Sequence, residues 1–280
     1  MANIWEVKTV WDDFFYQVFN ILIRARYIKE GGAKGHGLTK NISLRDCNKG
    51  KRAFIVGNGP SINQQNLKVL TNELVFFVNR GFLHPDYESI KPTYHIFIDP
   101  KMATGEWPLS FVDQAAEKNK DVEFIMNGRW FNMPEFEPYK KKYKIHWTMQ
   151  SLFFQPWRKA CVDLTRIGPG GAVVEQGILF ALYMGCRDIF FLGVDGNGLC
   201  HNLIGEESHF YGVNEEDIES SYSDIWRDLS MMSNSLRRWA ILSKFCAARN
   251  VNLVNLTKGG IINCCARNSL EDIVTKKHAP

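Results

Sequence analysis

Several common signatures are missing from this sequence of 280 residues. Its seven cysteines form no CxxC pair and are odd in number, which argues against a zinc site or a disulfide framework and favours the reduced thiols of a cytosolic protein. No apolar run is long enough to cross a bilayer. The N-terminal stretch contains Asp12 and Asp13 and lacks a small-residue cleavage site, so we do not expect a secretory signal. Internal repeats and low-complexity tracts are also missing.

The charge is too small to indicate a class of partner. A net charge of +4 gives no argument for nucleic-acid binding. With 45% hydrophobic and 23% charged residues, the composition suits a soluble core, and the length suits one large α/β domain or one domain with a small appendage. We therefore expect a soluble α/β protein that binds no nucleic acid.

The sequence is organised around residues 51–61, KRAFIVGNGPS. Ala53–Val56 is a short apolar run closed by GNGP, which predicts a buried strand that ends in a tight turn. Ser61 is a suitable N-cap for a following helix through Leu67 and Leu70. A strand, a glycine turn and a helix N-terminus form the geometry that binds a phosphate, so we predict a nucleotide or sugar-nucleotide site. An ordinary βα turn is the alternative, because the stretch completes neither GxGxxG nor a Walker loop.

Polar residues follow three successive predicted strands. Asn58 follows the first, Asn79 follows a strand over residues 75–78, and Asp99 follows a strand over residues 93–98. Because the carboxyl ends of parallel strands meet at one edge of a sheet, we expect these side chains to line a ligand site. For each residue alone, turn formation is the alternative.

The rest of the sequence continues the alternation of strands and helices. A region over residues 130–160, rich in aromatic residues and lysine, predicts an irregular and partly buried excursion, with stacking of sugars or bases as the alternative. The expected fold is a Rossmann-like, mostly parallel sheet flanked by helices, with a small lid subdomain. Further helices are expected over residues 111–120, 172–184 and 223–248, and further strands over residues 122–126, 188–194 and 251–256.

Two glycine-containing segments are further candidates for binding. RIGPGG at residues 166–171 precedes an apolar helix, and we expect the N–H groups of Gly170 and Gly171 to face an anion. Asp195 closes the next strand, and the polar, glycine-punctuated residues 197–209 suit a mobile flap over a site.

The first 30 residues show helical spacing of aromatic and aliphatic side chains, followed by Arg24, Arg26 and Lys29. A basic, aromatic, amphipathic helix can lie on a membrane surface, and packing on the domain or on a second subunit is the alternative. Residues 31–37 predict a flexible linker. The expected organisation is an N-terminal helix and linker (1–37), a nucleotide-sugar-binding core (38–196), a lid with His209 (197–222), and C-terminal helices and a last strand that complete the core (223–280).

The motifs, taken in order over residues 51–257, resemble the bacterial sialyltransferases of glycosyltransferase family 42. They are VGNGPS, an Asn after the next strand, a strand ending in FIDP, a glycine loop before an apolar helix, IFFLGVD and SHFYG. GNGPS is shared with wider relatives, including motility-associated glycosyltransferases and pterin pyrophosphokinase-like proteins of archaea, and SHFYG is more discriminating. The resemblance implies inverting transfer of a sialic acid-like or Kdo-like nonulosonic acid from a CMP-sugar to a hydroxyl of a bacterial surface glycan, with no essential metal or other cofactor.

The resemblance also implies a role for each candidate residue. His209 would take the proton from the acceptor hydroxyl, a role that suits a side chain with an unperturbed pKa of about 6.5. Asn58 and Ser61 would lie at the CMP phosphate and ribose, and Asp195 would hold the cytidine ribose or base. The full set of implied donor contacts is Asn58, Gly59, Ser61, Asn79, Asp99, Gly170, Gly171, Asp195 and Asn197.

The sequence departs from the family in its lid. Residues 195–203 lack the two tyrosines that in the family hydrogen-bond the leaving phosphate, and Asn197, His201, Tyr211 or Tyr222 are candidate substitutes. Two other functions therefore stay open: an ATP-dependent pyrophosphokinase-like enzyme, and a non-catalytic nucleotide-binding module of a polysaccharide assembly complex. The expected partners are a CMP-sugar, an oligosaccharide or glycolipid acceptor and further copies of the chain. The expected location is the cytoplasm or the inner face of the cytoplasmic membrane.

Overall fold

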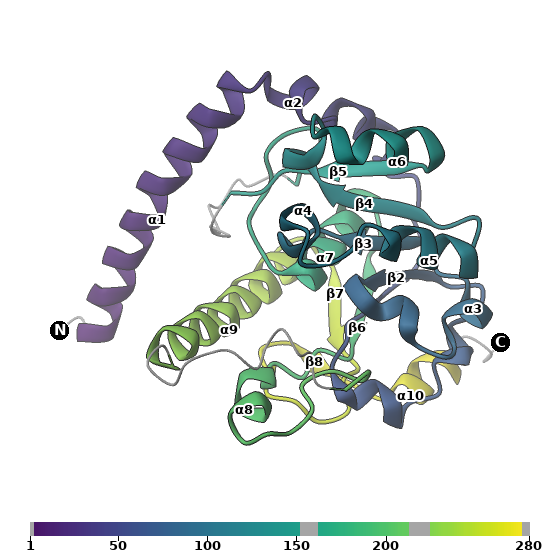
Figure 1. The fold of residues 1–280 in the computed structure, drawn as a ribbon. Coiled ribbons are helices and arrows are strands. Elements are labelled where there is room, and N and C mark those ends of the chain that lie inside the picture. Colours follow the sequence, from purple (N-terminus) through teal and green to yellow (C-terminus); the bar gives the residue numbers. More distant parts are fainter. Residues whose placement is uncertain (1–2, 152–161, 213–224, 276–280) are drawn as a thin grey trace.

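The computed structural model describes residues 3–151, 162–212 and 225–275. Its centre is an eight-stranded sheet in which every pair of neighbouring strands is parallel (Figure 1). The strand order is β5-β4-β3-β2-β1-β6-β7-β8. The strands are β1 (Ala53–Val56), β2 (Leu74–Val78), β3 (Tyr94–Phe97), β4 (Glu123–Asn127), β5 (Ile145–Thr148), β6 (Asp188–Leu192), β7 (Asn252–Asn255) and β8 (Ala266–Arg267).

The order of the strands reverses once, between β1 and β6. Strands β1 to β5 add to the sheet in one direction, and the chain then returns through helix α7 (Val173–Tyr183) to place β6 on the other side of β1. Such a reversal leaves a crevice outside the carboxyl ends of the two strands, which is where ligands bind in open α/β sheets. The predicted Rossmann-like, parallel α/β fold is confirmed.

Both faces of the sheet are buried, so its strands read as continuous apolar runs. Ile55 points to a layer formed by α7 and the C-terminal part of α9 (Ile225–Ala247), where Trp239 is buried. Phe54 and Val56 point to the opposite layer, which includes α3 (Tyr87–Ile90), α5 (Ser110–Lys118) and α10 (Leu270–Thr275). The remaining helices are α1 (Ile4–Lys29), α2 (Gly32–Gly35), α4 (Lys101–Thr104), α6 (Glu137–Lys142) and α8 (Gly198–Leu203), and the 3₁₀ turns are η1 (Leu38–Leu44), η2 (Pro60–Gln64), η3 (Leu67–Leu70), η4 (Asn79–Leu83), η5 (Gly128–Trp130) and η6 (Pro134–Phe136).

The helix predicted after the glycine turn does not form. Residues 60–70 make two short 3₁₀ turns, because the Asn66 side chain accepts from the Lys68 N–H and begins a new turn there. Ser61 lies inside the first turn with its side chain buried, and Gly59 stands at the N-cap position. The helix N-terminus that was expected to bind a phosphate is therefore absent from this turn.

Two other local predictions were wrong. The region over residues 130–160 contains an edge strand, β5, whose residues Ile145–Thr148 follow a run of lysines that concealed it. Residues 31–37, predicted as a flexible linker, contain the short helix α2 (Gly32–Gly35), and the His36 ring that follows it is buried and packs on Tyr27 with ring centroids 5.1 Å apart. Phe153, Phe154, Trp157, Tyr222 and the tail from Lys276 lie outside the described residues.

Helix α7, expected over residues 172–184, spans Val173–Tyr183, and Gly185 follows its C-cap residue Met184 at φ +88°. Within the described ranges, no helix combines the length and the apolar character that a membrane span needs.

Candidate functional site

Six strands in succession along the chain, β1 to β6, each end in or are closely followed by an amide or a carboxylate side chain. Because β1 to β6 are parallel, these side chains are brought to the same edge of the sheet. The sequence pattern identified the first three and the last as site residues. The two that it missed are Asn127 of β4 and Gln150, which follows the unpredicted strand β5. The six are Asn58, Asn79, Asp99, Asn127, Gln150 and Asp195.

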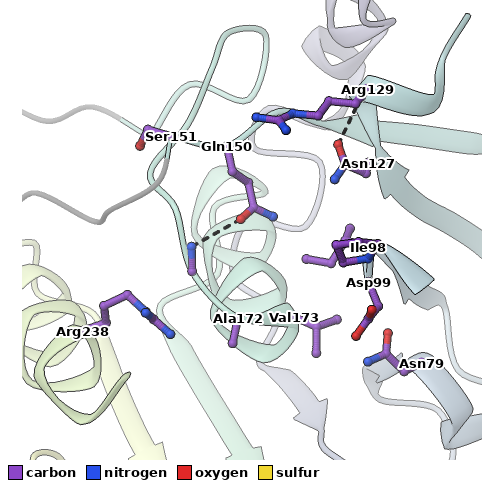
Figure 2. A pocket seen from close by; sticks show the side chains of 12 residues that line it. Asn79, Ile98, Asp99, Asn127, Arg129, Gln150, Ser151, Ala172, Val173 and Arg238 are labelled. Carbon is purple, nitrogen blue, oxygen red and sulfur yellow. Dashed lines mark hydrogen bonds between the residues drawn. The ribbon is translucent and has the colours of Figure 1, made fainter. Parts of the chain in front are cut away.

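Two cavities open along this edge. The first, which we call the switch-point cavity, has a volume of about 240 Å³ and is lined by residues 57–59, Asn79, residues 193–196 and the pair Ser208 and His209. The second, the edge cavity, has a volume of about 450 Å³ and lies beside it over β2 to β5 (Figure 2). Asn79 and Val173 line both cavities, so the two are neighbours.

Asn79 is held in an unusual conformation between the two cavities. Its φ is +44°, in the left-handed region that non-glycine residues seldom adopt. His95 Nε2 lies 2.7 Å from the Asn79 carbonyl oxygen, which can only accept, so Nε2 donates and Nδ1 accepts from the Tyr87 hydroxyl at 2.9 Å. Burial lowers the pKa of His95 to about 3, which keeps the ring neutral. The Asn79 side-chain oxygen is buried and accepts no hydrogen bond from any described residue.

The glycine turn lies directly over Asp195. The Gly59 N–H donates to the Gly193 carbonyl at 2.8 Å, and a Cβ on Gly59 would lie 1.8 Å from Asp195 Oδ2, so only glycine fits here. Asn58 donates through Nδ2 to the Val78 carbonyl at 3.2 Å. Its Oδ1 is buried and, like that of Asn79, has no partner in the described part of the chain.

The segment that carries His209 is docked on the glycine turn. The Phe210 N–H donates to the Asn58 carbonyl at 2.9 Å, and Asn63 Nδ2 donates to the Phe210 carbonyl at 3.2 Å. His209 Nδ1 lies 2.9 Å from the Ser208 hydroxyl. These contacts place the imidazole at the wall of the switch-point cavity.

A stack of side chains supports the same imidazole. The Tyr211 ring lies parallel to the His209 ring, with centroids 5.0 Å apart and an interplanar angle of 13°. The Arg80 guanidinium lies 5.2 Å from the Tyr211 ring centroid and 5.4 Å from that of Phe111. The family resembled in the sequence has isoleucine at the position of Tyr211, so this stack is a feature of the present chain.

In the glycine loop before α7, the Gly171 N–H that was predicted to face an anion is bonded to a side chain of the protein. The Gly171 N–H donates to Gln150 Oε1 at 3.3 Å (Figure 2), and the Ala172 N–H donates to Glu175 Oε2 at 2.5 Å. Burial raises the pKa of Glu175, although Arg238, which donates to the same oxygen at 3.2 Å, opposes the rise. The N-terminus of α7 is therefore occupied by a carboxylate of the protein itself.

Two arginines line the edge cavity, and one of them, Arg238, is already paired with Glu175 at 3.2 Å. Arg129 follows β4 and Arg238 belongs to α9, and they line the cavity from opposite sides (Figure 2). Arg129 comes directly after β4, whereas no local motif marks Arg238. Arg166 is not among the residues that line the edge cavity; it is exposed and pairs with Asp163 at 3.2 Å.

The structure separates the candidate donor contacts into three groups. Asn58, Gly59, Asn79, Asp195 and His209 line the switch-point cavity. Asp99 and Gly171 line the edge cavity, together with Asn79. The residues that line neither cavity are Ser61, Gly170 and Asn197.

We also looked for metal ligands, substitutes for the lid tyrosines and paired cysteines among the described residues. In the part of the chain that the structure describes, no group of three or more His, Cys, Asp or Glu residues is arranged to hold a metal ion. His201, a candidate substitute for the lid tyrosines, lies 2.8 Å from Glu206 and lines neither cavity. The six cysteines in the described ranges are all unpaired.

Residues 35–197 match the protein family described as 6-hydroxymethylpterin diphosphokinase MptE-like. None of the curated proteins matches the sequence. A solved structure similar to this chain is the MAf glycosyltransferase from Magnetospirillum magneticum AMB-1, at 12% identity and a TM-score of 0.46, covering 91% of this chain and 43% of that one. This chain therefore spans less than half the length of that protein.

A second similar structure is the sialyltransferase CstII from Campylobacter jejuni in complex with a substrate analogue, cytidine-5'-monophosphate. It has 14% identity and a TM-score of 0.46, and the match covers 78% of this chain and 85% of that one. CST-II in complex with a trisaccharide acceptor and CMP gives a TM-score of 0.45 at 14% identity, covering 78% and 86% of the two chains. Similarity at this level concerns the general arrangement of the chain and not individual site residues.

Proposed function

The chain belongs to the 6-hydroxymethylpterin diphosphokinase MptE-like family. From the geometry of its site we propose that it acts on a nucleotide-activated substrate, as an inverting glycosyltransferase. The proposed donor is a CMP-activated nonulosonic acid of the sialic acid or Kdo type, and the proposed acceptor is a hydroxyl of an oligosaccharide or glycolipid. The acceptor, the cytoplasmic location and the lack of an essential metal stay predictions.

One observation carries the proposal. A histidine lies at the same cavity as a glycine turn, at the point of the sheet where the strand order reverses. Asn58 and Asn79 each bring a buried amide oxygen to this place that has no partner among the described residues. Such oxygens are suited to accept hydrogen bonds from the hydroxyls of a ribose or a sugar, and binding a ligand there would satisfy them.

His209 has the surroundings that a general base needs. If Nδ1 carries the proton and donates to the Ser208 hydroxyl, the lone pair on Nε2 accepts the proton of the acceptor hydroxyl. The acceptor oxygen then forms a bond to the anomeric carbon while the bond from that carbon to the CMP phosphate oxygen breaks. The bonding electrons leave with the phosphate, and a single displacement inverts the configuration.

The edge cavity suits the sugar part of such a donor. Asn79, Asp99, Asn127 and Gln150 offer amides and a carboxylate to sugar hydroxyls, and Arg129 stands at its rim. With Arg238 on the opposite side, the cavity has positive charge for a carboxylate or a phosphate. We assign the nucleotide to the switch-point cavity and the anionic sugar to the edge cavity.

The family description favours a second candidate function. A diphosphokinase would transfer a diphosphate group from ATP to a hydroxyl, and ATP would be expected to act with Mg²⁺. Asp99 and Asp195 are the carboxylates of the two cavities that would be available to such a metal complex.

A thermal-shift panel tests these alternatives. We would compare CMP, CDP, UDP, GDP and ATP, each with and without Mg²⁺, since a ligand at a hundred times its Kd stabilises a fold by about 2.7 kcal/mol. Stabilisation by CMP or CDP without metal supports the glycosyltransferase. Stabilisation only by ATP with Mg²⁺ would replace it with the diphosphokinase. Binding of CMP without turnover of any CMP-sugar would leave a non-catalytic nucleotide-binding module.

A further inference from the structure

A third cavity, which we call the apolar cavity, lies between the start of α7 and the first half of α9 and has a volume of about 410 Å³. Helix α9 packs on the sheet through Trp239 and the residues after it, and its first half projects beyond the sheet in Figure 1. Met232 and Ser235 precede Trp239 by seven and four residues, so the side of the helix that packs on the sheet continues as the cavity wall. Leu199 of α8 and Ile262, from the loop after β7, also line the cavity.

The lining of the apolar cavity differs from that of the two cavities described above. Ten of the residues that line it have apolar side chains, and three have polar ones. Of these three, Asp228 pairs with Arg227 at 3.6 Å and Arg238 pairs with Glu175 at 3.2 Å, which leaves the Ser235 hydroxyl. A nucleobase or a bare sugar needs hydrogen-bond partners when it leaves water, whereas a hydrocarbon chain needs none. The lining therefore favours a hydrocarbon chain.

The apolar cavity adjoins the place of the proposed reaction. Val173 lines all three cavities. With the switch-point cavity, which His209 lines, the apolar cavity also shares Val174, Val194 and Gly196. Because the acceptor hydroxyl must lie within hydrogen-bond reach of the general base, the acceptor has to bind in a space that adjoins the histidine. The nucleotide and the anionic sugar are assigned to the other two cavities, so the apolar cavity is the space left for the acceptor.

We propose that the apolar cavity holds a hydrocarbon chain of the acceptor, which makes the acceptor a glycolipid whose chain is attached to the sugar that is glycosylated. This inference rests on the proposed glycosyltransferase function. Met231 and Met232 suit such a chain, because flexible thioether side chains adapt to the shape of an apolar ligand. Met231 is 62% exposed, so the cavity opens to solvent beside it and a chain longer than the cavity can leave there. A lipid separated from the attacked sugar by several other sugars would not reach this cavity.

Binding of two glycosides that differ only in their alkyl group tests the proposal. The probes are methyl β-D-galactoside and n-octyl β-D-galactoside, the second below its critical micelle concentration, and each Kd is measured by a nuclear magnetic resonance titration. Each CH₂ group taken out of water changes Kd by about fourfold, so the octyl glycoside should bind at least about tenfold more tightly than the methyl glycoside. Saturating CMP should leave the Kd of the octyl glycoside unchanged, because the nucleotide has a cavity of its own.

Two variants of α9 show whether the chain binds in this cavity. Met232→Glu places a carboxylate in the wall and should abolish the advantage of the octyl glycoside, while the exposed apolar side chains of α1 stay unchanged. Ser235→Phe fills the cavity without adding a charge and should weaken binding of the octyl glycoside by at least about tenfold. Leu229→Glu is the matched control, because Leu229 is an exposed apolar residue of the same helix that does not line the cavity. Circular dichroism would show that each variant is folded.

Three outcomes would overturn the inference. One is an equal Kd of the two glycosides for the wild-type protein. Another is an advantage of the octyl glycoside that survives in both Met232→Glu and Ser235→Phe. The third is competition between CMP and the octyl glycoside, which would assign the apolar cavity to the cytosine base.

The thermal-shift panel reports on the proposed function separately from these titrations. A protein that binds CMP and does not distinguish the two glycosides keeps the proposed function and loses this inference. A protein that prefers the octyl glycoside and binds no CMP loses the proposed function, and the acceptor role of the cavity is lost with it.

Discussion

The two cavities at the carboxyl edge of the sheet are built in different ways. The switch-point cavity is made from short motifs whose backbones bond to one another, such as the Gly59 N–H to the Gly193 carbonyl and the Phe210 N–H to the Asn58 carbonyl. The edge cavity is made from single side chains that come from separate strands and from α9, with Arg129 and Arg238 as its positive charges. Under the proposed function, the first would be the place for chemistry that needs fixed geometry, and the second would be the place for selecting the sugar.

His209→Ala should have the largest effect on catalysis. Loss of a general base lowers kcat by about 10²- to 10⁴-fold, while the CMP affinity should change little because no contact to the nucleotide is assigned to the imidazole. His201→Ala is the matched control, since His201 is a histidine of the same segment that lines neither cavity. Unchanged turnover of His209→Ala would contradict the assigned role.

Arg129→Gln should distinguish the roles proposed for the two cavities, because it should weaken binding of the sugar and not of the nucleotide. Loss of a hydrogen bond to a charged group costs about 1.5–3 kcal/mol, so KM for the CMP-sugar should rise by about 10- to 150-fold. The Kd for CMP itself, measured by calorimetry, should not change. Arg166→Gln provides the control, because Arg166 is exposed and lies outside the edge cavity. An equal loss of CMP affinity in Arg129→Gln would show that the nucleotide occupies the edge cavity.

His95 makes the stability of the region around Asn79 depend on pH. Its pKa is about 3 in the folded protein and about 6.5 when unfolded, so the unfolded chain takes up the proton first. The contribution of the buried, neutral His95 ring to the free energy of unfolding is complete above about pH 6.5. This contribution is lost as the pH falls toward 3, by about 2 kcal/mol between pH 7 and pH 5. Urea unfolding of the wild type and of His95→Gln at these two pH values measures it. A difference between the two proteins that does not vary with pH would contradict the assignment.

Removing the Tyr211 ring that stacks on His209 should have the smallest effect on kcat. An aromatic pair contributes about 0.5–1.5 kcal/mol, so Tyr211→Ile should lower kcat by about 2- to 12-fold with KM unchanged. Tyr211→Phe keeps the ring over the imidazole and should retain the wild-type kcat. If Tyr211→Phe loses as much as Tyr211→Ile, the hydroxyl acts instead, as one of the substitutes considered for the lid tyrosines.

Sequence patterns predicted what depends on neighbouring residues. The end of β1, the polar residues after β2 and β3, and the glycine after α7 all follow from short stretches of chain. Ser61 was misassigned because Asn66 begins a second 3₁₀ turn where one continuous helix was expected. The helical pattern of α1 was equally clear, but nothing in it indicated that Asn20 is buried while Trp11 and Phe15 are exposed.

The features of the site that sequence patterns did not predict depend on contacts between residues far apart along the chain. The N–H of Gly171 was expected to face a ligand, but it is satisfied by Gln150, a residue that follows an unpredicted strand. Arg238 enters the edge cavity from a helix more than sixty residues after the glycine loop, and its ion pair with Glu175 is a tertiary contact. No periodicity or local motif in the sequence predicts a contact between residues so far apart along the chain.

Hydrogen–deuterium exchange with and without CMP tests the central assignment most directly. We predict that CMP slows exchange of the backbone amides at residues 57–59 and 193–196, which line the switch-point cavity, in the wild type and equally in His209→Ala. Protection confined to residues 98–101, 127–129 and 150–151, around the edge cavity, would contradict the placement of the nucleotide at the switch point.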